Sequence, residues 1–214
     1  MQTWPWREVE GSGTAREIEI VLQTLDMLVP DGEGAYLAAP ISTGSRYYEA
    51  LARNGVTTYT ELIAAISIEQ YLSSVRWPNV ADGERTAADL RERGVPYVIN
   101  TGPLMVLGWQ GTDYMNLCFR LIERKVRRVY FHPEWAFSTG AVKEYLFCYR
   151  RGLPCLRLDG QPMRVDEARA NLADVCRYIR SRSILADSLE SKLRELDQLA
   201  GTPLGVEAEI NRSR

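Results

Sequence analysis

The chain has 214 residues, 45% hydrophobic and 25% charged, a composition typical of a soluble globular protein. Its formal net charge of −2 gives no overall attraction to a nucleic acid polymer or to an anionic membrane. No apolar run approaches the roughly 20 residues of a membrane-spanning helix, and the N-terminus lacks the apolar core of a signal peptide. We therefore expect a cytoplasmic protein without a membrane anchor.

Apolar periodicity divides the first half of the chain into alternating helices and strands. Residues 1–13 are expected to form an irregular arm. The elements that follow are predicted as a helix over 15–29, a strand over 35–41, a helix-rich stretch over 45–75, a loop over 76–86, a helix over 86–94 that ends at Gly94, and a strand over 96–100.

The second half continues the alternation and ends in helices. It is predicted as a loop over 101–111, a helix over 113–125, a strand over 126–131, a helix over 138–151, a strand over 153–159, helices over 165–180 and 184–199, and a flexible tail over 201–214. The pattern predicts an α/β fold with a Rossmann-like or flavodoxin-like parallel sheet of four to five strands and helices on both faces. We expect residues 14–160 to form this domain and 161–200 a C-terminal helical extension.

Cysteine and histidine usage limits the chemistry. The cysteines are scattered, which favours buried thiols over a disulfide framework or a zinc site: Cys118, Cys148, Cys155 and Cys176. His132 is the single histidine, so a paired-histidine metal centre is excluded, and a structural hydrogen bond is its expected role. We expect carboxylates to carry any catalysis, with no metal or other cofactor.

Three polar segments follow the predicted strands, at the edge where open parallel sheets bind ligands. They are PISTGSR, NTGP and HPEWAFSTG. In the first, backbone amides and side chains are suited to hold a phosphate, with Ser42, Gly44, Ser45 and Arg46 as the candidate ligands. The alternative, a polar connection without a ligand, stays open because no glycine-rich phosphate motif is present.

The third segment leads into AVKEYLF, where Ser138 is a candidate N-cap and Glu144 lies about two turns into the helix. A solvated Glu144 is the simpler interpretation, but its apolar neighbours indicate a buried carboxylate that is paired or functional. Asp113 is suited to cap its own helix. Tyr36, Trp109 and Trp135 equally fit a strand, loop or core position.

Together these segments resemble the nucleoside 2-deoxyribosyltransferase superfamily, which includes the 2′-deoxynucleoside 5′-phosphate N-hydrolases. The matching stretches are YLAAPIS, VIN, DYM, W-x-x-S-x-G-A-x-x-E and RRGLPC, within residues 35–160. The loop after the first strand, the long stretch over 54–94 and the terminal segments depart from the family pattern.

The resemblance implies an N-glycoside hydrolase or deoxyribosyltransferase. Glu144 would attack C1′ to form a glycosyl-enzyme intermediate, which water or a second base resolves. Asp113 would orient the sugar hydroxyl and help to protonate the leaving base. Tyr36 would tune the nucleophile through a hydrogen bond.

The resemblance also implies a substrate. Ser138 stands where the nucleoside transferases tend to have aspartate, and a serine leaves room for a 5′-phosphate; Gly140 belongs to the same motif. A nucleoside 5′-monophosphate is therefore the expected substrate, with Trp109 and Trp135 as candidates to stack its base. We expect a homodimer. Two alternatives stay open, a non-catalytic nucleotide-sensing module and an interaction protein whose terminal helices bind a partner.

Overall fold

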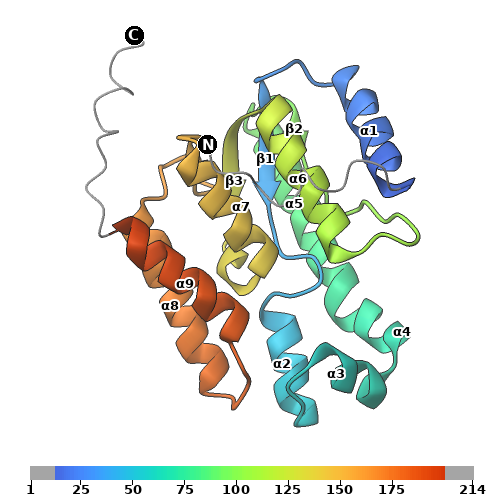
Figure 1. Cartoon of the computed structure of the whole chain (residues 1–214), viewed down its shortest axis with the longest axis vertical. Helices are drawn as coiled ribbons and strands as arrows, with labels where there is room; N and C mark the ends of the chain where they lie inside the picture. The colour runs from blue at the N-terminus through green and yellow to red at the C-terminus, as the bar shows by residue number, and fades with distance from the viewer. Residues whose placement is uncertain (1–12, 201–214) are drawn as a thin grey trace.

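Short apolar runs with buried side chains form a four-stranded parallel sheet at the centre of the molecule (Figure 1). The computed structural model describes residues 13–200. Its strands are β1 (Gly34–Ala38), β2 (Val98–Ile99), β3 (Val126–Phe131) and β4 (Cys155–Leu156), in the spatial order β2-β1-β3-β4. All five residues of β1 are buried, as expected for a central parallel strand covered on both faces. The predicted α/β class with a four-stranded parallel sheet is confirmed.

Alternating side chains of the strands divide the core between the two faces of the sheet. One face packs against α6 (Gly111–Lys125) and α7 (Thr139–Arg150), and its strand residues are Tyr36, Ala38, Val129 and Phe131. The opposite face packs against α5 (Trp77–Glu92), and its strand residues are Ala35, Leu37 and Tyr130. Helices therefore cover both faces, as the sequence predicts.

The two C-terminal helices, α8 (Val165–Arg180) and α9 (Asp187–Ala200), bury their apolar faces within the chain. α9 packs against α7 and α8, and the buried side chains include Leu172, Ile179, Leu189 and Leu196. Both helices lie near their predicted positions. They extend the layer that covers the α7 side of the sheet (Figure 1).

A helical stretch beyond the carboxyl ends of the strands connects β1 to β2. It consists of α2 (Ser45–Asn54), α3 (Tyr59–Ile66), α4 (Ile68–Tyr71), a π-helical turn η2 (Leu72–Arg76) and α5. The last three follow one another without a break from Ile68 to Glu92. In Figure 1 α2, α3 and α4 lie at the lower end of the molecule.

The predicted loop over residues 76–86 is wrong, because this stretch forms most of α5. Pro78 directly follows the π-helical turn η2, where the α-helical hydrogen-bond pattern is already interrupted, so the run accommodates its missing N–H. The Asp82-Gly83 pair resembles a turn signal in sequence. In the structure Gly83 is buried next to Asn100. A Cβ atom placed on it would lie 3.6 Å from Asn100 Nδ2, an ordinary contact distance.

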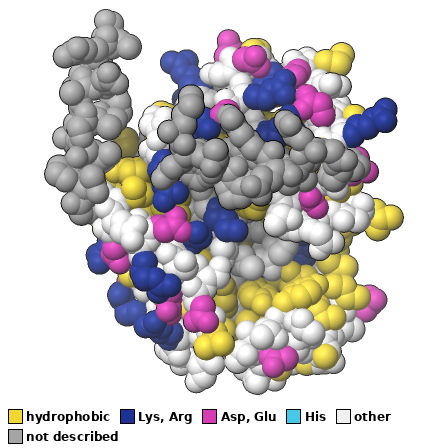
Figure 2. Space-filling view, viewed as in Figure 1, with side chains coloured by type: hydrophobic (Ala, Val, Ile, Leu, Met, Phe, Trp, Pro, Cys, Tyr) yellow, Lys and Arg dark blue, Asp and Glu magenta, His cyan; other side chains and the backbone are white. Residues whose placement is uncertain are grey.

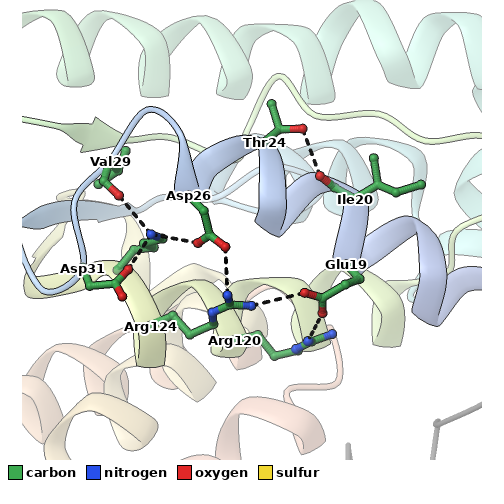
Figure 3. A network of polar contacts seen from close by, with 9 residues as sticks. Glu19, Ile20, Thr24, Asp26, Val29, Asp31, Arg120 and Arg124 are labelled. Carbon is green, nitrogen blue, oxygen red and sulfur yellow. Dashed lines mark hydrogen bonds and ion pairs between the residues drawn. The ribbon is translucent and has the colours of Figure 1, made fainter.

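Helix α1 (Gly13–Asp26) is held against α6 by a network of charged side chains (Figure 3). The Lys125 side chain is only 2% exposed, and its Nζ atom donates to the Val29 carbonyl at 3.0 Å. The ammonium also pairs with Asp26 at 2.7 Å and with Asp31. Around it, Arg124 bridges Asp26 and Glu19, and Arg120 contacts Glu19.

The four cysteines are free and buried, as predicted. Gly94 adopts a left-handed conformation (φ 82°) just beyond α5, as its predicted role requires. No helix within residues 13–200 is both long and apolar enough to cross a bilayer. The predicted tail over 201–214 and, except for Gly13, the predicted arm lie outside the described residues.

We expect Lys125→Met to lower the free energy of unfolding by about 2 kcal/mol, because the change removes the partner of the Val29 carbonyl and of Asp31 and leaves Asp26 with Arg124 alone. Arg124→Gln, in the exposed part of the same network, should cost less than about 1 kcal/mol. Urea unfolding measures both. Equal losses in the two variants would contradict a special role for the buried ammonium.

Candidate active site at the carboxyl edge of the sheet

Glu144 is placed by a helix that begins as the sequence predicts. Ser138 is the N-cap of α7, and its Oγ atom accepts a hydrogen bond from the Ala141 amide at 3.3 Å. The helix is packed on several sides, with Val142, Tyr145 and Leu146 all buried. Glu144 is therefore directed into the protein and is only 5% exposed. A solvated helix glutamate, the simpler interpretation of the sequence, does not describe this residue.

The Glu144 carboxylate belongs to a buried cluster from four different elements. The Tyr36 hydroxyl, from β1, donates to Glu144 Oε1 at 2.7 Å. The same hydroxyl lies 3.2 Å from Thr101 Oγ1, in the loop after β2. Cys118, on α6, has its Sγ atom 3.8 Å from Thr101 Oγ1 and interacts with the carboxylate. Sequence reasoning identified Tyr36 and Glu144 but not Thr101 or Cys118.

Burial dominates the electrostatics of this cluster. Loss of water raises the pKa of Glu144 from its ordinary value of 4.5 to about 7, and hydrogen bonds from Tyr36 and Cys118 limit the rise. Burial and the neighbouring carboxylate also raise the pKa values of Tyr36 and Cys118, so both stay protonated and act as donors. Near neutral pH the carboxyl is thus balanced between its two protonation states.

The first turns of α6 and α7 lie side by side at this edge. A Cβ atom on Gly140 would lie 3.4 Å from the Met115 sulfur, so the two helices approach closely there. Asp113, two residues before Met115, accepts a hydrogen bond from the Gln110 amide at 2.7 Å and closes a capping box. Asp113 therefore caps its own helix, which is the simpler of its two expected roles.

Three of the four predicted phosphate ligands already have side-chain partners within the chain, and Gly44 lies close to Asn79. Ser42 accepts from Tyr71 through its carbonyl at 2.7 Å and from Arg76 through its hydroxyl at 3.2 Å. Gly44 has φ 98°, and a Cβ there would lie 3.2 Å from Asn79 Nδ2. The guanidinium of Arg46 pairs with Asp82 at 2.6 Å and donates to Asn79 at 2.9 Å, and Ser45 binds a carboxylate.

That carboxylate is Glu134, which sequence reasoning missed. Its two oxygens accept from the Ser45 hydroxyl at 2.7 Å and from the Ser45 amide at 3.3 Å, at the start of α2. An internal anion thus occupies the helix terminus where a phosphate is expected. Its position in the sequence could have indicated this role, because Glu134 follows the end of β3 by three residues and so lies at the same edge of the sheet. The buried Asn79 amide, which donates to the Ile41 and Thr43 carbonyls, was also missed.

The two candidate base-stacking residues pack within the protein. Trp135 is 2% exposed and contacts Phe131 and Tyr145 edge-on or tilted. Trp109 is also buried, and its indole N–H donates to Glu17 at 2.6 Å. His132 accepts a hydrogen bond from the Glu134 amide through Nδ1 at 3.1 Å, in agreement with its expected structural role.

Two recesses lie near the carboxyl edge, and neither is bordered by Glu144. The first is a polar cluster around Arg46, Asp82 and Glu134 that leaves no room for a water molecule. The second is a groove of about 380 Å³ lined by residues of the β1–α2 loop and of the helices that follow it. Among residues 13–200, no group of histidine, cysteine, aspartate and glutamate side chains is arranged to hold a metal ion.

Comparison with known proteins gives no assignment. No protein-family model matches the chain, and neither a curated protein nor a solved structure does. The resemblance of the sequence motifs to the deoxyribosyltransferase superfamily therefore stays a prediction.

We expect the charge on Glu144 to destabilise the folded protein. Because its pKa is higher in the folded chain (about 7) than in the unfolded chain (4.5), the folded state loses stability as the pH rises between these values. The full difference amounts to about 3 kcal/mol above pH 7. Glu144→Gln keeps an acceptor for Tyr36 without the charge, so it should be more stable than the parent at pH 8.

Thermal unfolding at pH 5 and pH 8 measures this difference. Glu49→Gln, which removes an exposed carboxylate paired with Arg53 on α2, is the matched control and should leave the pH dependence unchanged. Identical pH dependence in the parent and in Glu144→Gln would show that Glu144 does not titrate in this range.

Proposed function

We propose that the protein is an N-glycosidase that cleaves the bond between the base and the sugar of a nucleoside 5′-monophosphate. The observation that carries the proposal is the 2.7 Å hydrogen bond from Tyr36 to the buried Glu144 carboxylate at the carboxyl edge of the sheet. A carboxyl with a pKa of about 7 is available as a carboxylate near neutral pH, and catalytic groups are characteristically perturbed in this way.

In the proposed reaction a Glu144 oxygen bonds to C1′ while the bond from C1′ to the base breaks, and the base leaves with a proton. Water, or a second base in a transferase, then displaces the glutamate with retention at C1′. The Tyr36 hydroxyl binds one Glu144 oxygen and leaves the other as the attacking atom. Asp113, from the adjacent first turn of α6, is proposed to orient the sugar hydroxyl, to give the leaving base its proton and to take a proton back from the attacking water or second base.

The proposed 5′-phosphate would bind at the start of α2, where the Ser45 amide and hydroxyl now bind Glu134. The phosphate would have to displace this carboxylate, because two anions at one helix terminus repel each other. Ser42, Gly44 and Arg46 are the remaining proposed ligands of the phosphate, and Ser138, in the same motif as Gly140, is proposed to leave room for it.

Cellular context and assembly are part of the same proposal. The four buried free thiols support a reducing compartment, which we propose is the cytoplasm. We also propose a homodimer, which the two amphipathic C-terminal helices suggest in sequence; α8 and α9 bury their apolar faces within their own chain.

A second candidate is a nucleotide-binding module without catalysis. It is favoured by the position of Glu144, which is buried and borders neither of the two recesses. In such a module the carboxyl would accept or donate a hydrogen bond and would form no covalent bond. Release of free base distinguishes the two candidates.

We expect Glu144→Gln to reduce release of base from nucleoside 5′-monophosphates by at least about 10³-fold, because an amide does not replace a carboxylate nucleophile. Chromatography of a panel of monophosphates and nucleosides measures the free base. Glu49→Gln serves as the control and should keep the parent rate. Release that persists in Glu144→Gln would remove this residue from the mechanism, and stabilisation by a nucleotide without release in the parent would favour the binding module.

The pH profile provides a separate test. The kcat/KM of the parent should rise with pH and level off above about 7, as Glu144 loses its proton. Tyr36→Phe removes a donor that stabilises the carboxylate, so the pKa of Glu144 should rise and the acidic limb should move to higher pH. A limb that stays in place, measured over pH 5–9, would contradict control of Glu144 by Tyr36.

A further inference from the structure

A groove on the helical stretch between β1 and β2 has the composition of a small-molecule site. Its volume of about 380 Å³ lies within the range of ligand pockets. The lining residues come from the β1–α2 loop, α2, α3, α4 and η2: Ser42, Thr43, Tyr47, Tyr59, Ile68, Tyr71, Leu72 and Arg76. In Figure 2 hydrophobic side chains gather at the lower right, over the part of the molecule where Figure 1 places α3 and α4.

The apolar part of the groove is built from aromatic rings. Tyr59 and Tyr71 meet edge to face, with 5.1 Å between the ring centroids and 81° between the planes. The Tyr71 hydroxyl is held by the Ser42 carbonyl, which fixes the ring. Tyr59 is 45% exposed, so it presents ring surface to an incoming molecule. Ile68 and Leu72 add aliphatic surface, and this combination suits a flat apolar ring.

The polar part of the groove carries a positive charge, Arg76, that no carboxylate among residues 13–200 neutralises. Arg76 donates to the Ser42 hydroxyl at 3.2 Å and lies over the Trp77 ring, but it forms no ion pair with any carboxylate of residues 13–200. Its Nε atom is buried and has no hydrogen-bond partner in this part of the chain. Arg46, Arg53 and Arg85, on the same helical stretch between β1 and β2, by contrast all pair with acidic side chains. An anion is the natural complement of Arg76.

We propose that this groove binds a small molecule that combines a planar aromatic ring with an anionic group. The ring lies against Tyr47, Tyr59 and the aliphatic side chains, and the anion meets Arg76 and the hydroxyls of Ser42 and Thr43. The groove shares no lining residue with the Glu144 cluster, but it shares Ser42 with the proposed 5′-phosphate site. Tyr59 and Arg76 belong to the groove alone, and binding there requires no glycosidase reaction.

Two kinds of molecule share this chemistry, nucleotides and aromatic carboxylic acids, and calorimetric titration distinguishes them. The probes are adenosine 5′-monophosphate and indole-3-acetate, with adenosine, indole and inorganic phosphate as their fragments. All titrations use the full chain with Glu144→Gln, which prevents turnover. We expect one complete probe to bind at least tenfold more tightly than either of its fragments, and the affinity to fall with added salt.

Paired variants locate the binding. Tyr59→Ala should weaken the complete probe by about tenfold, and Tyr97→Ala, which removes a similarly exposed ring outside the groove, should not. Arg76→Gln should weaken binding by about tenfold and reduce its salt dependence, while Arg76→Lys should keep most of the affinity. Arg53→Gln is the control for lost charge. Circular dichroism confirms that each variant is folded.

Three results would overturn the proposal. The first is that neither complete probe binds, and the second is that Tyr59→Ala binds as tightly as the parent. The third is that Tyr59→Ala without ligand sediments differently from the parent, which would identify the groove as a contact between copies of the chain. The glycosidase proposal is tested separately. It fails if the unmodified chain releases no free base, whatever the groove binds.

Discussion

The central constraint in this protein is a carboxyl group buried against a tyrosine hydroxyl. Glu144 is surrounded by apolar side chains of α7 and receives a hydrogen bond from Tyr36 on the adjacent strand. Burial raises the free energy of its charged form, and the donors from Tyr36 and Cys118 offset only part of that increase. A neutral side chain would fill this position at lower cost, and the proposed glycosidase reaction would give the ionised group a use.

The same edge of the sheet holds a second carboxylate in a very different setting. Glu134 lies at the start of α2, where the Ser45 amide and hydroxyl stabilise its negative charge. Burial thus raises the pKa of Glu144 to about 7, while Glu134 compensates the positive end of α2. One edge of the sheet therefore holds a buried carboxyl group and an anion-binding position that the chain itself fills.

Sequence periodicity was enough to predict the sheet, both C-terminal helices and the burial of Glu144, because these depend on local apolar patterns. Strand β3 and helix α8 lie at their predicted bounds. The error at residues 76–86 arose because Pro78 and Gly83 act as turn signals only when no tertiary contact supports a helix. The Ser45–Glu134 bond spans 89 positions, and Thr101 and Cys118 reach Tyr36 and Glu144 only through the fold, so no local pattern reveals them.

The unbroken helical run from Ile68 to Glu92 has a mechanical consequence. Tyr71, Arg76 and Asn79, on successive turns of this run, donate hydrogen bonds to the loop that follows β1. These three hydrogen bonds hold the β1–α2 loop against the helical run and restrict its independent motion. A rearrangement of that loop must therefore either move the whole helical run or break these hydrogen bonds, so we expect the loop and the run to move together.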